Sequence, residues 1–201
     1  MGTRNLTIVK HKGEYKVAQY GQWDGYPSGQ GLTVLEFARS LCTVNTLLEF
    51  TRKVDAVQVA SIEYINDINK RIDNDDLKDW TSEYPELSRD TCAKILQMIM
   101  DRPSGIKLKD DINFAADSLF CEWAYVIDLD DGTFEAYQGF NRSPLKPEDR
   151  FFFLSGSRPQ GYGEDFYPIK LYPGAKWNLQ ALPTQEEFVS TFYRDRGEDI
   201  A

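Results

Sequence analysis

The stretch from Gly21 to Gly31, GQWDGYPSGQG, combines residue types that small-molecule binding sites use. The aromatic faces of Trp23 and Tyr26 can stack on a base or a sugar. The backbone N–H groups of a glycine-bearing loop can hold an anion, and Asp24 adds a carboxylate. A plain turn requires no tryptophan and no tyrosine, so we predict a loop on which a ligand packs. A tight crossover whose aromatic residues cover the core is the alternative.

Other residues are predicted to complete this site. A second glycine-bearing stretch, SGSRPQGYGED at 155–165, could close over the ligand and adds another guanidinium and another aromatic ring. Arginine groups and loop amides are the donors that hold carboxylates and phosphates. We therefore expect a nucleotide-like or other anionic small molecule as the partner, although an ion pair between Arg4 and Asp24 could be purely structural. The predicted ligand-binding residues are Arg4, Gln22, Trp23, Asp24, Tyr26, Arg158 and Tyr162.

Two other classes of function stay open from the sequence. A hydrolase could use carboxylates such as Asp117 and Glu122, or Cys121 as a nucleophile. A cysteine nucleophile needs a base, and the single histidine, His11, lies in a charged turn, which favours a buried structural Cys121. A protein-interaction module anchored by exposed aromatic residues is the third class. We expect no cofactor and no metal, because the acidic run 73–76 lacks the glycine and the glutamate of a calcium loop.

Composition narrows the partners further. The chain of 201 residues has a net charge of −9 and a pI near 4.7, which argues against binding to duplex nucleic acid. No apolar stretch is long enough to span a bilayer, and the three cysteines have no metal-binding spacing, so we expect a cytoplasmic protein without membrane contact. The sequence leaves the oligomeric state open.

The elements that position the loop follow from periodicity. Alternating residues predict a hairpin over 6–20 with its turn at 11–13. Thr33 and Glu36 have capping-box spacing, which predicts a helix beginning there. Further helices are expected from 44 to 72, with Asn45 as a cap, and from 88 to about 100, with Ser88 as a cap.

Strand periodicity returns in the second half of the chain. Residues 123–129 and 133–137 flank Asp131-Gly132, a strong hairpin signal. The runs 151–154 and 167–172 are predicted strands, and the capping-box pair Thr184 and Glu187 predicts a closing helix. The whole chain, 1–201, is therefore predicted to be a single α+β domain, with a largely antiparallel sheet packed with a central helical segment.

Four stretches taken together point to a known family. They are MGTR at 1–4, EYKVAQYGQWDGYPSGQG at 14–31, SRDT at 88–91 and DSLFCEWAYVIDLD at 117–130. The chain resembles, from residue 1 to about 140, an uncharacterised family of bacterial, phage and fungal proteins that open with Met-Gly-Thr-Arg and carry an Asp-Gly-Tyr-Pro loop.

The resemblance implies a compact intracellular protein, plausible as a phage gene product, and supplies no activity. A phage counter-defence protein could sequester or degrade a host signalling nucleotide, or inhibit a host protein. The family pattern has glycine where Cys92 stands, so this cysteine is not expected to be a required catalyst.

Overall fold

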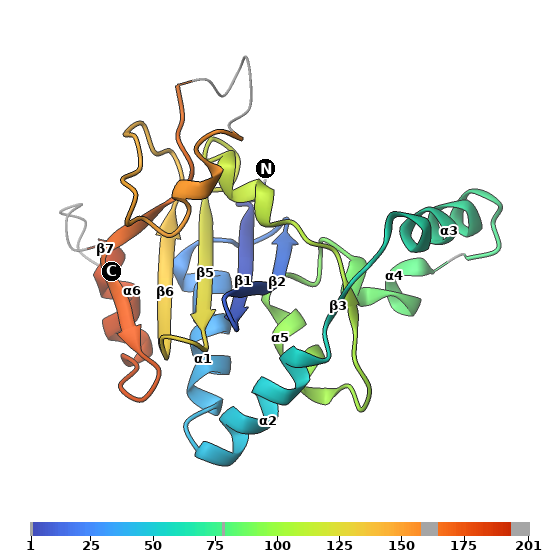
Figure 1. Cartoon of the computed structure of the whole chain (residues 1–201), viewed down its shortest axis with the longest axis horizontal. Coiled ribbons are helices and arrows are strands. Elements are labelled where there is room, and N and C mark those ends of the chain that lie inside the picture. Colours follow the sequence, from blue (N-terminus) through green and yellow to red (C-terminus); the bar gives the residue numbers. More distant parts are fainter. Residues whose placement is uncertain (1, 78, 158–164, 194–201) are drawn as a thin grey trace.

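The fold is built on a mixed sheet. The computed structural model describes residues 2–77, 79–157 and 165–193 (Figure 1). Within these residues a five-stranded sheet has the order β2-β1-β5-β6-β7, and its neighbouring strands are antiparallel apart from the parallel pair β1–β5. The strands are β1 (Asn5–His11), β2 (Glu14–Gly21), β5 (Trp123–Asp128), β6 (Thr133–Gln138) and β7 (Lys170–Asn178).

Both predicted hairpins are confirmed, and they lie in this one sheet. Lys12 and Gly13 both have positive φ, 54° and 75°, as the tight turn between β1 and β2 requires. At the second turn Gly132 has φ 65°, and the Asp128 carboxylate accepts the N–H groups of Asp130 and Asp131. The predicted α+β class with a largely antiparallel sheet is confirmed.

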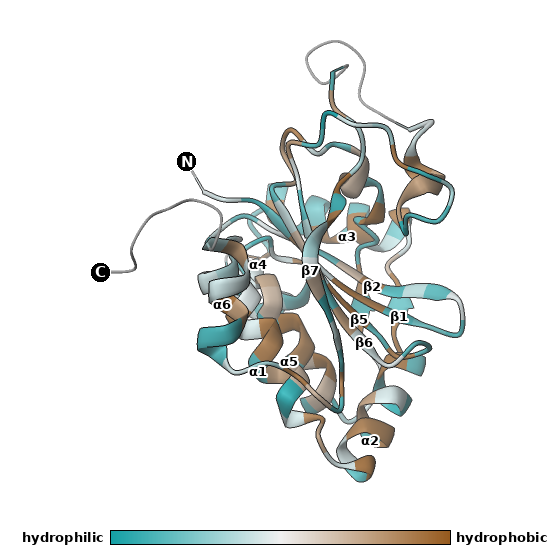
Figure 2. Cartoon of the chain, turned by 90° about the vertical axis from the view of Figure 1, so that its left-hand side faces the viewer, coloured by the Kyte–Doolittle hydropathy of each residue, from teal (hydrophilic) through white to brown (hydrophobic). Residues whose placement is uncertain are grey.

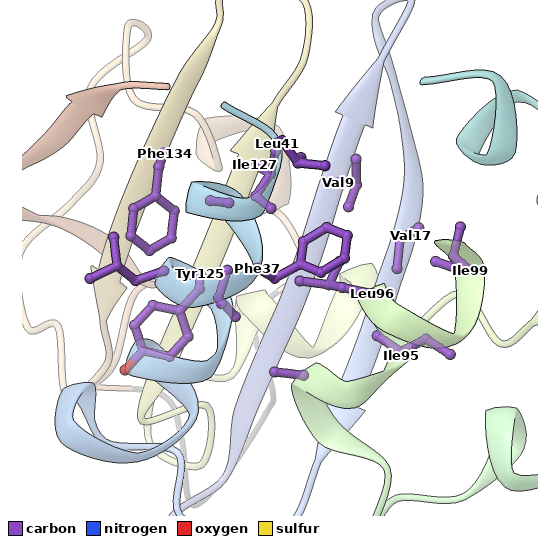
Figure 3. Packing of buried hydrophobic residues seen from close by; sticks show 14 of the residues in the cluster. Val9, Val17, Phe37, Leu41, Ile95, Leu96, Ile99, Tyr125, Ile127 and Phe134 are labelled. Carbon is purple, nitrogen blue, oxygen red and sulfur yellow. The ribbon is translucent and has the colours of Figure 1, made fainter. Parts of the chain in front are cut away.

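Helices cover one face of the sheet, as Figure 2 shows for α1, α5 and α6. The covering helices are α1 (Leu32–Ser40), α2 (Val44–Asp55), α5 (Ile95–Asp101) and α6 (Gln185–Tyr193). Alternate strand residues face them. Tyr125, Ile127 and Phe134 pack with Phe37 and Leu96 of the helices in the main core (Figure 3).

Irregular segments cover the opposite face. The intervening strand residues, such as Val126 and Ile8, pack there against two 3₁₀ turns, Ile112–Ala116 and Phe152–Leu154, and against Phe151. The sheet is therefore buried on both sides, although helices lie on one side alone within the described residues.

A small arm extends from the body on the side away from α6 (Figure 1). It contains α3 (Ile62–Asp73) and α4 (Trp80–Glu83) around its own apolar cluster of Ala60, Ile68, Leu77 and Leu87. The short strands β3 (Gln58–Val59) and β4 (Lys107–Leu108) pair in parallel where the arm begins and ends. No helix in the described part of the chain is long and apolar enough to cross a bilayer.

Several predicted helix starts differ from the structure. The capping box at Thr33 is absent, because α1 begins at Leu32 on a π-helical turn, Pro27–Gly31, and the Thr33 hydroxyl donates to the Gly29 carbonyl. Ser88 caps no helix. Its hydroxyl accepts the Asp90 N–H, and α5 begins only after a 3₁₀ turn at Cys92–Lys94.

Two further helix starts depend on threonine. Thr43, and not Asn45, caps α2 through a reciprocal box with Thr46. The box of Thr184 and Glu187 is confirmed, since each residue accepts the other's backbone N–H.

The predicted strand at 151–154 is wrong, because Phe152–Leu154 is a 3₁₀ turn. Phe151 and Leu154 are buried while Phe152 and Phe153 are 41% and 55% exposed, which is the three-residue spacing of a helical turn. The predicted strand at 167–172 is displaced, since β7 runs from Lys170 to Asn178.

A buried charge cluster ties the hairpins to the irregular layer. Arg150 donates to the Glu135 carboxylate at 2.9 and 3.0 Å and lies 2.8 Å from Asp128. Lys10 and Lys176 add further ion pairs to Asp128 and Glu135. Burial by itself raises the pKa of Glu135, but its hydrogen bonds from Arg150, Tyr137 and Lys176 outweigh burial and hold that pKa at about 2.

The Arg150→Met substitution tests whether this cluster holds the two layers together. Removing one partner leaves buried carboxylates without compensation, which costs about 3–5 kcal/mol of unfolding free energy. Urea unfolding should show that loss for Arg150→Met. The matched variant Arg142→Met changes an exposed arginine of the same loop and should cost under about 1 kcal/mol. Equal effects for the two variants would contradict the role of the cluster.

Acid should weaken the fold through Glu135. Its pKa in the folded protein is lowered from 4.5 to about 2, so the folded protein releases this proton more easily than the unfolded chain does. The stabilisation is complete above about pH 4.5 and is lost as the pH falls through about 2. Unfolding free energies measured across this window should fall less steeply for Glu135→Gln than for the native chain.

Candidate functional site

The Gly21–Gly31 loop is fastened at several points by backbone hydrogen bonds. Gly25 N–H donates to the Thr3 carbonyl at 2.9 Å, and Gln22 N–H donates to the Arg89 carbonyl at 3.1 Å. From inside the core the Tyr125 hydroxyl donates to the Gly25 carbonyl at 2.9 Å. The loop is therefore held by the N-terminal segment, by the segment before α5 and by β5.

The glycines of the loop are required by close packing. A Cβ on Gly25 would lie 2.7 Å from the Thr3 carbonyl oxygen, and one on Gly29 would lie 2.2 Å from the Asp24 carbonyl oxygen. Gly2 in turn packs against the loop, where a Cβ would lie 2.4 Å from the Trp23 ring. Residues 2–3 and the loop, both part of the stretches on which the family resemblance is based, are thus in direct contact.

Trp23 lies on the outside of this contact. Its ring packs on Gly2, its Nε1 donates to Asp90 at 2.7 Å, and 45% of the residue stays exposed. Arg4 is directed elsewhere, with its guanidinium 4.4 Å from the centre of the Phe120 ring. Within the described residues no ion pair joins Arg4 to Asp24, and Gln22 accepts the Tyr20 hydroxyl.

Tyr26 borders a pocket with aromatic walls. A hollow of about 310 Å³ lies between the loop, the ends of the strands and α6, and we call it the aromatic pocket. Its lining residues are Tyr26, Pro27, Trp123, Gln138, Tyr172, Phe192 and Tyr193. Of the residues predicted from sequence, Tyr26 is the one that lines it within the described chain. Arg158 and Tyr162 lie outside the described residues, so their predicted roles stay predictions.

The pocket wall is a packed set of rings. The Phe192 ring lies 5.4 Å from Trp123 in an edge-on contact and 4.8 Å from Tyr172, and the Tyr172 hydroxyl donates to the Phe192 carbonyl at 3.3 Å. Edge-on and tilted contacts of this kind fix ring orientations. The wall is therefore formed before any ligand arrives.

Pairing register places Gln138 in this wall. Gln138 lies directly opposite Trp123 across the β5–β6 pair, so both side chains project from the same face of the sheet. The sequence reasoning missed both residues, although counting outward from the Asp131-Gly132 turn would have paired them. The Gln138 carboxamide supplies one hydrogen-bond acceptor and two donors in a wall that is mainly aromatic.

The charge beside Tyr26 is negative. Asp24 is exposed, and its carboxylate accepts the Tyr26 hydroxyl at 3.3 Å. The Asp24 charge, followed by burial, raises the pKa of Tyr26. No lysine or arginine lines the aromatic pocket within the described chain, so its wall offers no cation for an anionic ligand.

Cys121 does not resemble a nucleophile in this setting. Burial, followed by the charges of Asp117 and Glu122, raises the pKa of its thiol well above the ordinary value, and the thiol donates to the Trp123 carbonyl. His11 lies at the first hairpin, within 3.5 Å of Asp55 and Asp130. A thiolate at neutral pH is therefore not supported.

The two candidate carboxylates lie in different surroundings. Burial raises the pKa of Asp117 against the hydrogen bonds from Phe120 and Leu119 N–H and the charge of Arg4, and Glu122 accepts the Arg4 N–H at 3.2 Å.

The pKa of Asp128 is lowered overall, since hydrogen bonds from Asp131 N–H, Arg150 and Lys10 outweigh its burial, so it stays ionised. No cluster of three or more His, Cys, Asp or Glu suited to a metal ion occurs among the described residues.

Cys92 lies beneath the loop in a conformation that suits glycine. Its φ is +48°, its side chain is buried, and its thiol lies 3.8 Å from the Trp23 carbonyl oxygen. A non-glycine residue in the left-handed region is strained. This backbone geometry explains why glycine is expected at the position.

Because the backbone at Cys92 is strained, we expect the Cys92→Gly variant to be at least as stable as the Cys92→Ala variant. In most buried positions alanine is more stable than glycine, but at φ +48° glycine avoids a strain of about 1 kcal/mol or more. Chemical unfolding should therefore find Cys92→Gly at least as stable as Cys92→Ala. A Cys92→Ala protein more stable than Cys92→Gly by about 1 kcal/mol, the usual difference, would contradict the assigned backbone strain.

The chain matches no family model, no curated protein and no solved structure. The family resemblance seen in the sequence therefore stays a prediction, and the function has to be argued from the aromatic pocket.

Proposed function

We propose that the protein binds a small molecule carrying a flat ring, of the nucleobase type, in the aromatic pocket. The observation that carries this proposal is the wall itself, in which five aromatic residues from the loop, β5, β7 and α6 surround one carboxamide, counted within the described chain. Stacking on aromatic side chains tolerates any base, because every base has a π face.

The polar group in the wall supports a nucleobase over a plain hydrocarbon ring. Gln138 can both donate to and accept from the edge of a base. A volume of about 310 Å³ lies at the lower end of the range for small-molecule sites, which suits one ring system with a small substituent.

The anionic part of the expected ligand has weaker support. Asp24 places negative charge beside Tyr26, and a phosphate close to it would meet repulsion. Lys170 is the cross-strand neighbour of Gln138, yet it lines a separate charged pocket with Arg150 and Glu135. A nucleoside-sized ligand therefore fits the pocket better than a nucleotide. Sequestration of a signalling nucleotide by a phage protein stays a prediction, as do hydrolysis and inhibition of a host protein.

The Tyr26→Leu variant tests the proposal with adenosine as the probe. Isothermal titration should detect adenosine binding to the native protein. Loss of one stacking ring should weaken binding by about tenfold, since such contacts contribute about 1–3 kcal/mol. Tyr26 is 39% exposed and its hydroxyl bonds only to Asp24 among the described contacts, so the fold should tolerate leucine.

Trp23→Leu is the matched control. Trp23 is an exposed aromatic residue of the same loop that does not line the aromatic pocket. This variant should keep the native affinity for adenosine while losing stability, because it removes the hydrogen bond to Asp90 and the packing on Gly2. The proposal would be rejected if the native protein did not bind adenosine. It would also be rejected if Trp23→Leu lost adenosine binding while Tyr26→Leu kept the native affinity.

A further inference from the structure

We infer that the aromatic pocket selects a positively charged ring, such as an N-methylated nucleobase, over a neutral ring of the same shape. The inference rests on the proposed function and adds the charge of the ligand. Aromatic faces attract cations through the ring quadrupole, and cages of several rings recognise methylated cationic groups in this way.

The first support is a contrast within the molecule. Elsewhere in the described chain, aromatic faces are covered by the protein's own cations, as where Arg4 lies over Phe120 and Lys107 lies 4.5 Å from the centre of the Tyr64 ring. Arg71 over Tyr84 and Arg142 over Phe166 repeat the arrangement. No such pair involves a ring of the aromatic pocket among the described residues. Tyr26, Trp123 and Tyr172 of the pocket are at least partly exposed, so their rings can meet a cation from outside.

The second support is the position of Asp24. Its carboxylate is exposed, it forms no ion pair with a described lysine or arginine, and it accepts the hydroxyl of Tyr26, which lines the pocket. A phenol that donates to a carboxylate is polarised toward a more negative ring, which strengthens its attraction for a cation. The net charge of −9 also attracts a cationic ligand, over a longer range.

The loop fixes Asp24 in this position. Asp24 has φ +52°, its carbonyl accepts the Gln30 N–H at 2.8 Å, and Gly29 packs against the same carbonyl. Asparagine and aspartate tolerate the left-handed region better than other non-glycine residues. An Asp24→Asn substitution therefore removes the charge and keeps the backbone.

Two isomeric nucleosides provide the probe. 1-Methyladenosine is protonated and therefore a cation at neutral pH, whereas its isomer N6-methyladenosine is neutral. Isothermal titration of the native protein should find the cation bound about tenfold more tightly, the size expected for a desolvated cation–π contact. The preference should shrink at high salt, because the Asp24 contribution acts through solvent and is screened.

Asp24→Asn and Asp75→Asn form a matched pair of variants. Asp75 is also an exposed aspartate with left-handed φ, +60°, but it lies between α3 and α4 in the sequence. These two helices form the arm on the side of the molecule away from α6 (Figure 1). Asp24→Asn should reduce the preference for 1-methyladenosine to a few-fold, while Asp75→Asn should leave it unchanged. Tyr26→Leu should weaken the binding of both isomers.

The outcomes separate the two proposals. Equal affinities for the two isomers in the native protein would overturn the charge preference and leave ring binding in place. Binding of neither isomer would overturn both. A preference that neither Asp24→Asn nor Asp75→Asn reduces would assign it to the rings alone. Equal reduction by both variants would assign the charge effect to the net charge, and either result would overturn the specific role of Asp24.

Discussion

The structure around the aromatic pocket depends on the close approach of the glycine loop to the N-terminal segment. An added Cβ on Gly2 or Gly25 would come within 2.7 Å of an atom on the other side of this contact, and one on Gly29 would lie 2.2 Å from the Asp24 carbonyl oxygen within the loop. This approach lets Thr3 and Tyr125 fasten the loop, and it turns Tyr26 toward β5 and α6 while Trp23 packs outward. The glycines thus shape the edge of the pocket that Tyr26 lines.

Local signals in the sequence were enough for the hairpins. Turns such as Lys12-Gly13 and Asp131-Gly132 are set by the residues that form them, and the alternating strands beside them follow directly. The parallel pairing of β1 with β5 could not be predicted in this way, because it depends on which faces two distant hairpins bury. The strand predicted at 151–154 was wrong for a related reason, because the sequence does not show which of its four apolar residues are buried. The first and last are buried and the middle two are exposed, as in a helical turn.

The site was only partly predictable from the sequence. Tyr26 and Asp24 stand out because they interrupt a glycine-rich stretch. In the structure Tyr26 lines the aromatic pocket, and Asp24 accepts its hydroxyl. Trp123, Tyr172 and Phe192 resemble ordinary core residues in sequence, since each belongs to a regular strand or helix. They form one surface because Tyr172 of β7 and Phe192 of α6 both contact Trp123 of β5 in the folded chain. The sequence pattern of a single segment cannot predict contacts between segments so far apart.

The parallel pair β1–β5 also determines when the molecule can fold during synthesis. Strand β1 lies between β2 and β5, and its partners across the parallel pair, such as Lys10 and Asp128, are 118 residues apart. At ribosomal rates, the N-terminal hairpin waits on the order of ten seconds for β5 to emerge. During that interval one edge of β1 presents unpaired backbone groups, the feature that attracts chaperones and strand-to-strand aggregation. The nascent chain is therefore most vulnerable before any residue beyond Trp123 has been made.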